Sequence, residues 1–187
     1  LHRLIRRQRQ MCIRDRFRSD LEVCSIRGNV DTRLRKVFTG EVDGIVVAAA
    51  AMIRLGWQDR ITEYLPLEHF MPAVGQGALV VEARLDDKEI AELISPLNHI
   101  PAWQSVMAER AFLRAIGGGC RAPIAALGAV NSSTLKLEGM IASPDGRRML
   151  RASEEGSAMS PKEVGTRLAK KMLAMGASGF IAEVRGR

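Results

Sequence analysis

The stretch ERAFLRAIGGGCRAP (residues 109–123) decides how the C-terminal half of this chain folds. Its first eight residues continue an apolar face at helical spacing, which predicts an amphipathic helix that runs up to the glycines. Glycine can adopt the left-handed conformations that end a helix, and Pro123 disfavours a new helix directly afterwards. The sequence therefore predicts a short loop, called the cysteine loop below (residues 117–123). The thiol of Cys120 in this loop is either presented for chemistry or packed as a small apolar residue in a turn.

The residues after the cysteine loop predict a small sheet. Strand character recurs three times, over residues 124–130, 135–142 and 149–155. A Pro-Asp-Gly turn joins the last two of these strands. Helices are predicted before the loop at residues 86–97 and 103–116. A three-stranded antiparallel sheet with helices on one face is an α+β unit, and we place its boundary near Ile100.

A further helix is predicted near the C-terminus. Ser160 and Glu163 have the spacing of a capping box, and Pro161 stands at the first helical position. These residues predict a helix that continues through Met175, and residues 180–184 predict one more helical turn.

The N-terminal part of the chain alternates between strand and helix patterns. Its second strand pattern is a continuous apolar run, which is typical of a strand buried on both faces. Asp31 or Thr32 can cap the first helix. A β-α-β-α order predicts parallel strands joined by a right-handed crossover. The strand patterns cover residues 21–26 and 44–48, and the helix patterns cover residues 31–38 and 49–55.

Three arginines stand where an open α/β sheet would bind a ligand. Arg27 follows the first predicted strand, Arg33 lies in the first turns of the next helix, and Arg54 ends the second helix. Ligands of such sheets bind at the carboxyl ends of the strands, and arginine forks bind carboxylates through paired hydrogen bonds. A carboxylate site is one interpretation. Solvated helix arginines, such as Arg35 nearby, are the other.

A glycine-rich stretch follows this lobe. The sequence PAVGQG, called the glycine segment below (residues 72–77), has no lysine and lacks the spacing of a P-loop. We therefore do not expect it to cradle a phosphate. Residues 78–83 (ALVVEA) predict another strand.

Charge and composition exclude several functions. The 187 residues carry a formal charge of +7, but residues 1–20 hold seven arginines and two aspartates and so account for five of those charges. The rest of the chain is nearly neutral and has one tyrosine for stacking, so we expect no nucleic-acid partner. No apolar run is long enough to span a bilayer, so we expect no membrane partner.

The spacing of the cysteines and histidines excludes a disulfide framework and a metal site. Three cysteines at wide spacings do not form a disulfide framework and favour a reducing cytoplasm. His2, His69 and His99 show no metal-ligand spacing, so we expect no metal site.

Three separated blocks resemble one known family in the same order. They are IRGNVDTRL (residues 26–34), PAVGQGA (residues 72–78) and ERA with GGC and PI (within residues 109–124). Through them the chain resembles the porphobilinogen deaminase (hydroxymethylbilane synthase) family from about Leu21 onward. The resemblance implies a partial periplasmic-binding-protein-like parallel α/β lobe, followed by a small α+β domain.

The resemblance implies a transferase of tetrapyrrole biosynthesis. Members of this family join four porphobilinogen molecules head to tail with release of ammonia. They prime the reaction with a covalent dipyrromethane cofactor, and the resemblance places its thioether at Cys120. A soft sulfur nucleophile suits that bond.

The resemblance also implies residues that bind the carboxylates of the pyrrole rings. Arg27 and Arg33 bind the cofactor in this interpretation. The substrate-binding residues it implies are Arg27, Arg33, Arg54 and Gln76, with Arg6 and Arg7 as further candidates that resemble the end of the family's Ser-Leu-Arg-Arg motif.

The family's essential aspartate belongs to an N-terminal domain that we do not find in this chain. Asp31 and Asp43 are candidates only by elimination, and a helix cap or a surface position is the alternative for each. The catalytic residue is therefore unknown, and we expect the chain to be inactive alone. An alternative function is a non-catalytic module that binds carboxylate ligands and leaves Cys120 unmodified.

The expected organisation has four parts and belongs to a cytoplasmic protein that is monomeric at full length. Strand 78–83 is expected to return to the N-terminal domain and to be unpaired without it, which is an aggregation hazard. The parts are an arginine-rich, atypical start (residues 1–20), a partial substrate-binding lobe (21–71), a crossover between domains (72–99) and a cofactor-attachment domain (100–187).

Overall fold

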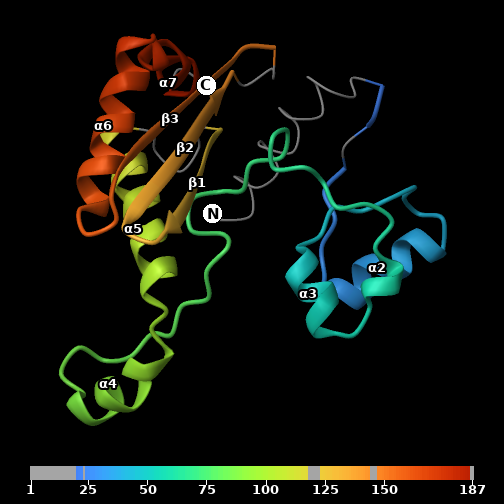
Figure 1. Cartoon of the computed structure of the whole chain (residues 1–187). Coiled ribbons are helices and arrows are strands. Elements are labelled where there is room, and N and C mark those ends of the chain that lie inside the picture. The colour runs from blue at the N-terminus through green and yellow to red at the C-terminus, as the bar shows by residue number, and fades with distance from the viewer. Residues whose placement is uncertain (1–19, 23, 118–122, 144–146, 186–187) are drawn as a thin grey trace. The chain divides into compact units, whose positions relative to one another are not determined.

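The computed structural model describes residues 20–22, 24–117, 123–143 and 147–185 (Figure 1). The chain divides into two compact units, one of which is Glu22–Phe70. The other contains all residues from Met71 onward, and it is called the C-terminal unit below.

An antiparallel sheet forms the centre of the C-terminal unit. Its strands are β1 (Ile124–Asn131), β2 (Thr134–Ala142) and β3 (Met149–Ser157), in the order β1-β2-β3. Asn131 pairs with Thr134, so β1 and β2 are joined by a two-residue hairpin in which Ser132 has a φ of 54°. Positive φ is what the favoured two-residue hairpin turns require. The predicted three-stranded sheet is confirmed.

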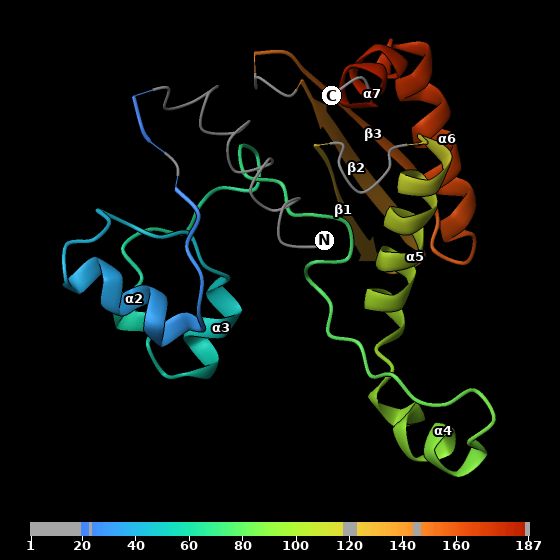
Figure 2. The ribbon, with the colours of Figure 1, turned by 180° about the vertical axis from the view of Figure 1, so that it is seen from behind.

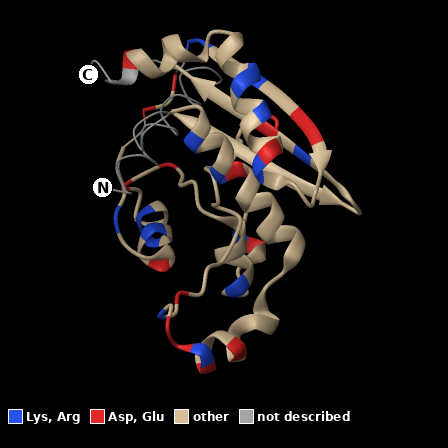
Figure 3. Cartoon of the chain, turned by 90° about the vertical axis from the view of Figure 1, so that its left-hand side faces the viewer, with Lys and Arg blue, Asp and Glu red and all other residues tan. Residues whose placement is uncertain are grey.

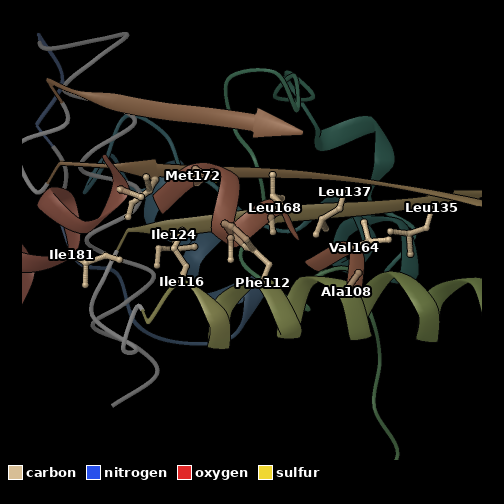
Figure 4. Packing of buried hydrophobic residues seen from close by; sticks show 14 of the residues in the cluster. Ala108, Phe112, Ile116, Ile124, Leu135, Leu137, Val164, Leu168, Met172 and Ile181 are labelled. Atoms are coloured by element: carbon tan, nitrogen blue, oxygen red, sulfur yellow. The ribbon is translucent and has the colours of Figure 1, made fainter. Parts of the chain in front are cut away.

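Helices α5 (Ile100–Ala115) and α6 (Pro161–Ala174) cover one face of this sheet (Figures 1 and 2). Successive strand residues point to opposite faces, so alternate residues of β2 point toward the helices. Figure 4 shows side chains from both helices and the sheet meeting in one apolar layer. Its fully buried members include Ala108, Phe112, Ile124, Leu135, Leu137, Ile141, Val164, Leu168 and Met172.

Gly165 allows α5 and α6 to approach each other closely. A Cβ atom at this position would lie 2.2 Å from the carbonyl oxygen of Ala108 and 2.8 Å from the backbone nitrogen of Phe112. Both distances are far inside van der Waals contact, and both partners are backbone atoms that no rotamer change can move. The crossing of the two helices therefore requires a glycine here.

The predicted C-terminal helix is present, but its cap differs from the prediction. The Ser160 side chain makes no capping hydrogen bond; instead its carbonyl oxygen accepts from the N–H groups of Glu163 and Val164. The capping-box prediction is therefore wrong. The buried Pro161 and the apolar face of α6 fix the start of the helix by packing. Helix α7 (Ala177–Arg185) then extends the predicted last turn.

The chain before α5 is less regular than predicted. The single helix expected at residues 86–97 is instead α4 (Lys88–Ile94) followed by the 3₁₀ turn η2 (Ser95–Leu97). Pro96 lies in η2, and a proline has no N–H to continue an α-helical ladder. Helix α5 begins before the predicted Trp103, because the His99 side chain accepts a hydrogen bond from the Ala102 N–H and caps it.

Residues 78–83, predicted as a strand, form no strand with any described segment. Leu79 and Val80 are 87% and 84% exposed. A strand exists only through ladder hydrogen bonds to a neighbour, and β1, β2 and β3 pair only with one another here. The segment is thus an exposed apolar run.

The unit Glu22–Phe70 contains α2 (Val30–Phe38), α3 (Ala49–Arg54) and the 3₁₀ turn η1 (Gln58–Arg60). The two predicted α-helices are confirmed. The strands predicted at residues 21–26 and 44–48 are absent from the described residues. Parallel strands that are buried on both faces belong to larger sheets, and two short segments alone make too few ladder hydrogen bonds to form a stable one.

Local packing in this unit is correspondingly slight. Leu34 and Met52 are the buried apolar side chains among its described residues. The cap of α2 is Asn29, whose Oδ1 accepts from the Thr32 N–H at 3.4 Å. The prediction that Asp31 or Thr32 caps α2 is therefore wrong. Asn29 has the extended backbone that an N-cap residue needs, whereas Asp31 and Thr32 already lie within the first turn of the helix.

Candidate functional site

The cysteine loop is anchored in the core at both ends. Ile116 at the end of α5 and Ile124 at the start of β1 are buried, and so is Pro123. Gly117 has a φ of 73°, the left-handed conformation predicted for the end of this helix. Cys120 lies among residues 118–122, outside the described part of the chain, so its role stays a prediction. What the structure fixes is where the loop leaves and re-enters the core.

Glu109 is the one strongly buried carboxylate among the described residues, with 5% of its surface exposed. Its Oε2 accepts a hydrogen bond from the Gly75 N–H at 2.6 Å, and its Oε1 accepts one from the Gly128 N–H at 2.9 Å. Burial raises the pKa of this carboxyl, and the two backbone hydrogen bonds oppose that shift without cancelling it. One side chain of α5 therefore binds the glycine segment and β1 together.

In the sequence Glu109 stands out only as part of a family motif, and its contact with the two glycines was not predicted. The available signal is its position on the helix. Glu109 stands beside Ala108 and one turn before Phe112, both fully buried, so it lies on the face that turns inward. A charged residue on an inward face must find polar partners, because an unpaired buried carboxylate is costly.

The glycine segment is docked on the C-terminal unit through both faces of the sheet. Met71, just before it, packs with Ala125 and Met140. Val74 packs against the larger cluster that contains Phe112. Gly75, with a φ of 70°, then turns its N–H toward Glu109. The segment thus passes the edge of β1 and ends beside α5.

Gln76, predicted at a substrate cleft, is exposed and stabilises its own turn. Its Oε1 accepts from the Ala73 N–H at 3.1 Å, and its backbone N–H donates to the Ala73 carbonyl at 2.9 Å. The side-chain amide nitrogen is not used in these bonds. The residue is therefore held in place and keeps donors for a ligand.

Two of the predicted arginines flank one turn. Arg27 is exposed and directly precedes Gly28, which has a φ of 114°. The Arg33 Nε donates to the Gly28 carbonyl at 2.8 Å, which ties this half-buried side chain to the same turn. Arg54 is exposed at the C-terminal end of α3. The structure thus brings Arg27 and Arg33 to one end of α2 and leaves Arg54 on another helix.

Among the described residues, the structure gives the remaining candidate site residues no partner that would assign them a role. Asp31 is exposed in the first turn of α2, and Asp43 is exposed in the connection that follows. Neither carboxylate is buried near a partner that would make it a catalytic acid or base. Arg6 and Arg7 lie outside the described residues.

Basic and acidic residues are interspersed over the described residues of both units (Figure 3). Across the sheet, for example, Arg151 pairs with Glu138 at 2.9 Å. Within the described part of the chain, no group of three or more metal-ligating His, Cys, Asp or Glu residues occurs. None of the helices described is both long and apolar enough to cross a membrane.

Two family models match this chain. One, described as "Porphobilinogen deaminase, dipyromethane cofactor binding domain", matches residues 4–92, and the other, "Porphobilinogen deaminase, C-terminal domain", matches residues 103–174. The first match begins at residue 4, so the similarity reaches further toward the N-terminus than Leu21, where the sequence blocks placed its start. Arg27 and Arg33 fall in the first match and Cys120 in the second.

Curated relatives with the name porphobilinogen deaminase cover nearly the whole chain. The protein from Desulforudis audaxviator is 47% identical over 169 residues, which are 90% of this chain and 55% of the relative. The protein from Geobacter metallireducens is 45% identical over 183 residues, or 98% of this chain and 57% of the relative. The protein from Moorella thermoacetica is 47% identical over 170 residues, or 91% and 54%. The chain spans about half the length of the curated relatives it matches.

Proposed function

Because this chain belongs to the porphobilinogen deaminase family, we propose that it serves the transferase reaction that joins four porphobilinogen molecules head to tail. The reaction releases ammonia and gives hydroxymethylbilane for tetrapyrrole biosynthesis. The observation that carries the proposal is the pair of family matches, which follow each other along residues 4–92 and 103–174. The chain spans about half the length of the curated relatives it matches, so we propose that the 187 residues do not complete turnover alone.

The cofactor proposed for this site is dipyrromethane, which supplies the primer on which the pyrrole chain grows. Cys120 would hold it through a thioether, and Arg27 and Arg33 would bind its carboxylates. The donor set fits the group, because a thiolate forms a stable bond to carbon and guanidinium forks match carboxylates. The burial of Ile116 and Ile124 supports the proposal, since the core holds the residues on either side of the cysteine loop.

The substrate-binding residues proposed are Arg27, Arg33, Arg54 and Gln76. Arg27 and Arg54 are exposed and able to meet the acetate and propionate groups of a pyrrole. Arg33 uses its Nε on the Gly28 carbonyl, which leaves both terminal nitrogens for a bidentate contact. Arg6 and Arg7 remain further candidates by family resemblance.

The proposal extends to the fold and state of the whole protein. We propose that residues 21–71 belong to a parallel α/β lobe of the periplasmic-binding type and that residues 100–187 form the cofactor-attachment domain. Helices α2 and α3 stand where such a lobe would place them in the chain order. We propose a monomeric, cytoplasmic protein for the full length.

A second candidate function is a module that binds carboxylate ligands without chemistry. It is favoured by the turn at Gly28, which follows Arg27 directly and accepts a hydrogen bond from Arg33, because neither arginine depends on the cysteine loop for its position. In that case Cys120 would be unmodified, and Cys120→Ser would leave ligand binding intact.

Intact-protein mass spectrometry tests the proposed cofactor site. The chain is expressed in cells that make the pathway's intermediates, beside the variants Cys120→Ser and Cys24→Ser. We expect a mass increase of one dipyrromethane in the wild-type chain, its loss in Cys120→Ser and its retention in Cys24→Ser, because Cys24 is an exposed thiol outside the cysteine loop. An unmodified wild-type mass would favour the binding module.

A further inference from the structure

We propose that Glu109 is a positioning residue that holds the glycine segment, and with it Gln76, at a fixed place beside the helix that leads to Cys120. The roles of Gln76 and Cys120 in this statement rest on the proposed function. The tether itself rests on two hydrogen bonds to one buried carboxylate, at 2.6 Å from Gly75 and 2.9 Å from Gly128.

The contact joins three segments that are far apart in the sequence. Glu109 lies in α5, and Gly75 lies well before this helix, with α4 and η2 between them. Gly128 lies in β1, which follows the cysteine loop. A hydrogen bond to a charged acceptor is shorter and stronger than a neutral one. Both oxygens are occupied, so the side chain cannot turn toward one partner without leaving the other.

Gly128 offers its N–H to Glu109 because of the register of β1. Pro123 and Ala142 form a hydrogen-bonded pair, and such pairs alternate along an antiparallel ladder. Gly128, opposite Leu137, is therefore in a non-hydrogen-bonded pair, and its N–H points to the open edge of the sheet. Glu109 accepts from an edge donor that no strand of the described residues covers.

Both glycines are needed at their positions for the carboxylate to reach them. A Cβ at Gly128 would lie 3.0 Å from the Cα of Ser105, one turn before Glu109 on the same helix. Gly75 has a φ of 70°, which side-chain-bearing residues rarely adopt. The close approach of β1 to α5 brings the Gly128 N–H to the Glu109 carboxylate, and the sharp turn of the glycine segment brings the Gly75 N–H to it.

The consequence is a rigid link between two parts of the proposed site. The next residue after Gly75 is Gln76, and the helix that carries Glu109 ends at the cysteine loop. Among the described residues, the apolar contacts of Met71 and Val74 also attach the glycine segment, but both residues lie before the turn. Loss of the Glu109 hydrogen bond to Gly75 would therefore release Gln76 and leave the packing of the apolar core unchanged.

The first experiment measures amide hydrogen exchange by NMR in the full 187-residue chain. Glu109→Gln keeps the shape of the side chain but replaces one acceptor oxygen by an NH₂ group, which cannot accept from an N–H. We expect the Gly75 or the Gly128 amide to exchange roughly ten-fold faster, while the amides of β2 and β3 keep their rates. The matched control is Glu138→Gln, a carboxylate of the same sheet that pairs with Arg151 and with neither glycine.

The second experiment measures position directly. Spin labels at Gly77→Cys, where a Cβ meets nothing within 4 Å, and at Arg110→Cys, with the three native cysteines replaced by serine, report the distance between the glycine segment and α5. We expect a narrow distribution with Glu109 present and a broad one in Glu109→Gln and Glu109→Ala. Loss of stability alone would not broaden it in molecules that remain folded.

Two results would overturn the proposal. One is wild-type exchange at both amides in Glu109→Gln, and the other is a narrow distance distribution in Glu109→Ala. Neither readout depends on the cofactor. A wild-type chain that never gains the dipyrromethane mass would contradict the proposed function of Cys120, while the exchange and distance data would still decide the role of Glu109.

Discussion

Glu109 is an acidic side chain on the inward face of a helix, beside the fully buried Ala108 and Phe112. Burying a carboxylate is unfavourable unless hydrogen bonds replace its water, and here two backbone N–H groups do so. The raised pKa reports the part of the desolvation cost that these bonds leave uncompensated. The buried carboxylate therefore lowers the stability of the folded chain somewhat while it holds the glycine segment and β1 together.

The raised pKa predicts how the stability of the chain depends on pH through Glu109. The folded state binds the proton of Glu109 more tightly than the unfolded state does, so this side chain contributes most at low pH. Its contribution falls as the pH rises from the ordinary value of 4.5 through the raised one. Urea unfolding at several pH values should show the wild-type chain losing stability relative to Glu109→Gln over that window.

Glu41 provides a control with the opposite sign. A hydrogen bond from Lys36, and then the charge of that lysine, lower the pKa of this exposed carboxyl. Its contribution is present above the ordinary value and is lost as the pH falls through the lowered one. Relative to Glu41→Gln, the wild-type chain should therefore lose stability toward acid. If the difference in unfolding free energy between wild type and variant changed with pH in the same direction for Glu109→Gln as for Glu41→Gln, the raised pKa of Glu109 would be contradicted.

At the scale of the elements, the packing of α5 against α6 and the sheet determines the C-terminal unit. Phe112 from α5 and Leu168 from α6 meet over Gly139 of β2, where a Cβ would lie 2.8 Å from the ring of Phe112. Figure 4 shows both side chains pointing into the layer between the helices and the sheet. Small residues at the crossings set the distance between the layers.

Gly165→Ala should destabilise the C-terminal unit through overpacking. The new methyl group would overlap the backbone of α5, so the helices must separate, at a cost of about 1–3 kcal/mol or more. Thermal unfolding followed by circular dichroism measures the loss. Gly179→Ala is the matched control, because a Cβ at that position in α7 meets nothing within 4 Å. The control should be neutral or stabilising by up to about 1 kcal/mol. Equal effects of both changes would refute the packing argument.

At the scale of the whole molecule, residues 78–83 are an apolar run without a described partner. Leu79, Val80 and Val81 are exposed, and none of the three strands pairs with them. Contiguous exposed apolar residues with free backbone groups favour pairing with another chain. We expect the chain to associate with itself through this run.

Val80→Lys should reduce that association without changing the fold. Val80 is 84% exposed, so a lysine there breaks the apolar run and removes no buried contact. Light scattering over a concentration series should show a smaller average mass for the variant at equal thermal stability. A matched change at Thr134, an exposed β2 residue at the hairpin, should leave the association unchanged. If Val80→Lys lowers the melting temperature, the segment is packed in solution and the interpretation fails.

The sequence by itself determined where most helices lie, though not all of their ends, and it determined the three strands of the C-terminal sheet, the glycine that ends α5 and the family. These features depend on periodicity and on residues within one turn of each other, so local physics specifies them. Asn29 was missed as a cap because three neighbouring residues can all serve, and only the backbone conformation selects one.

Only the tertiary structure decided which predicted strands exist and what Glu109 does. Residues 21–26, 44–48 and 78–83 have strand patterns as clear as that of β1, yet a strand needs a neighbour to bond with, and the pattern cannot say whether one is present. Glu109 meets Gly75 and Gly128, which are distant in sequence, so no local pattern reveals that contact. Long-range pairing is a property of the folded chain, because it depends on segments that only folding brings together.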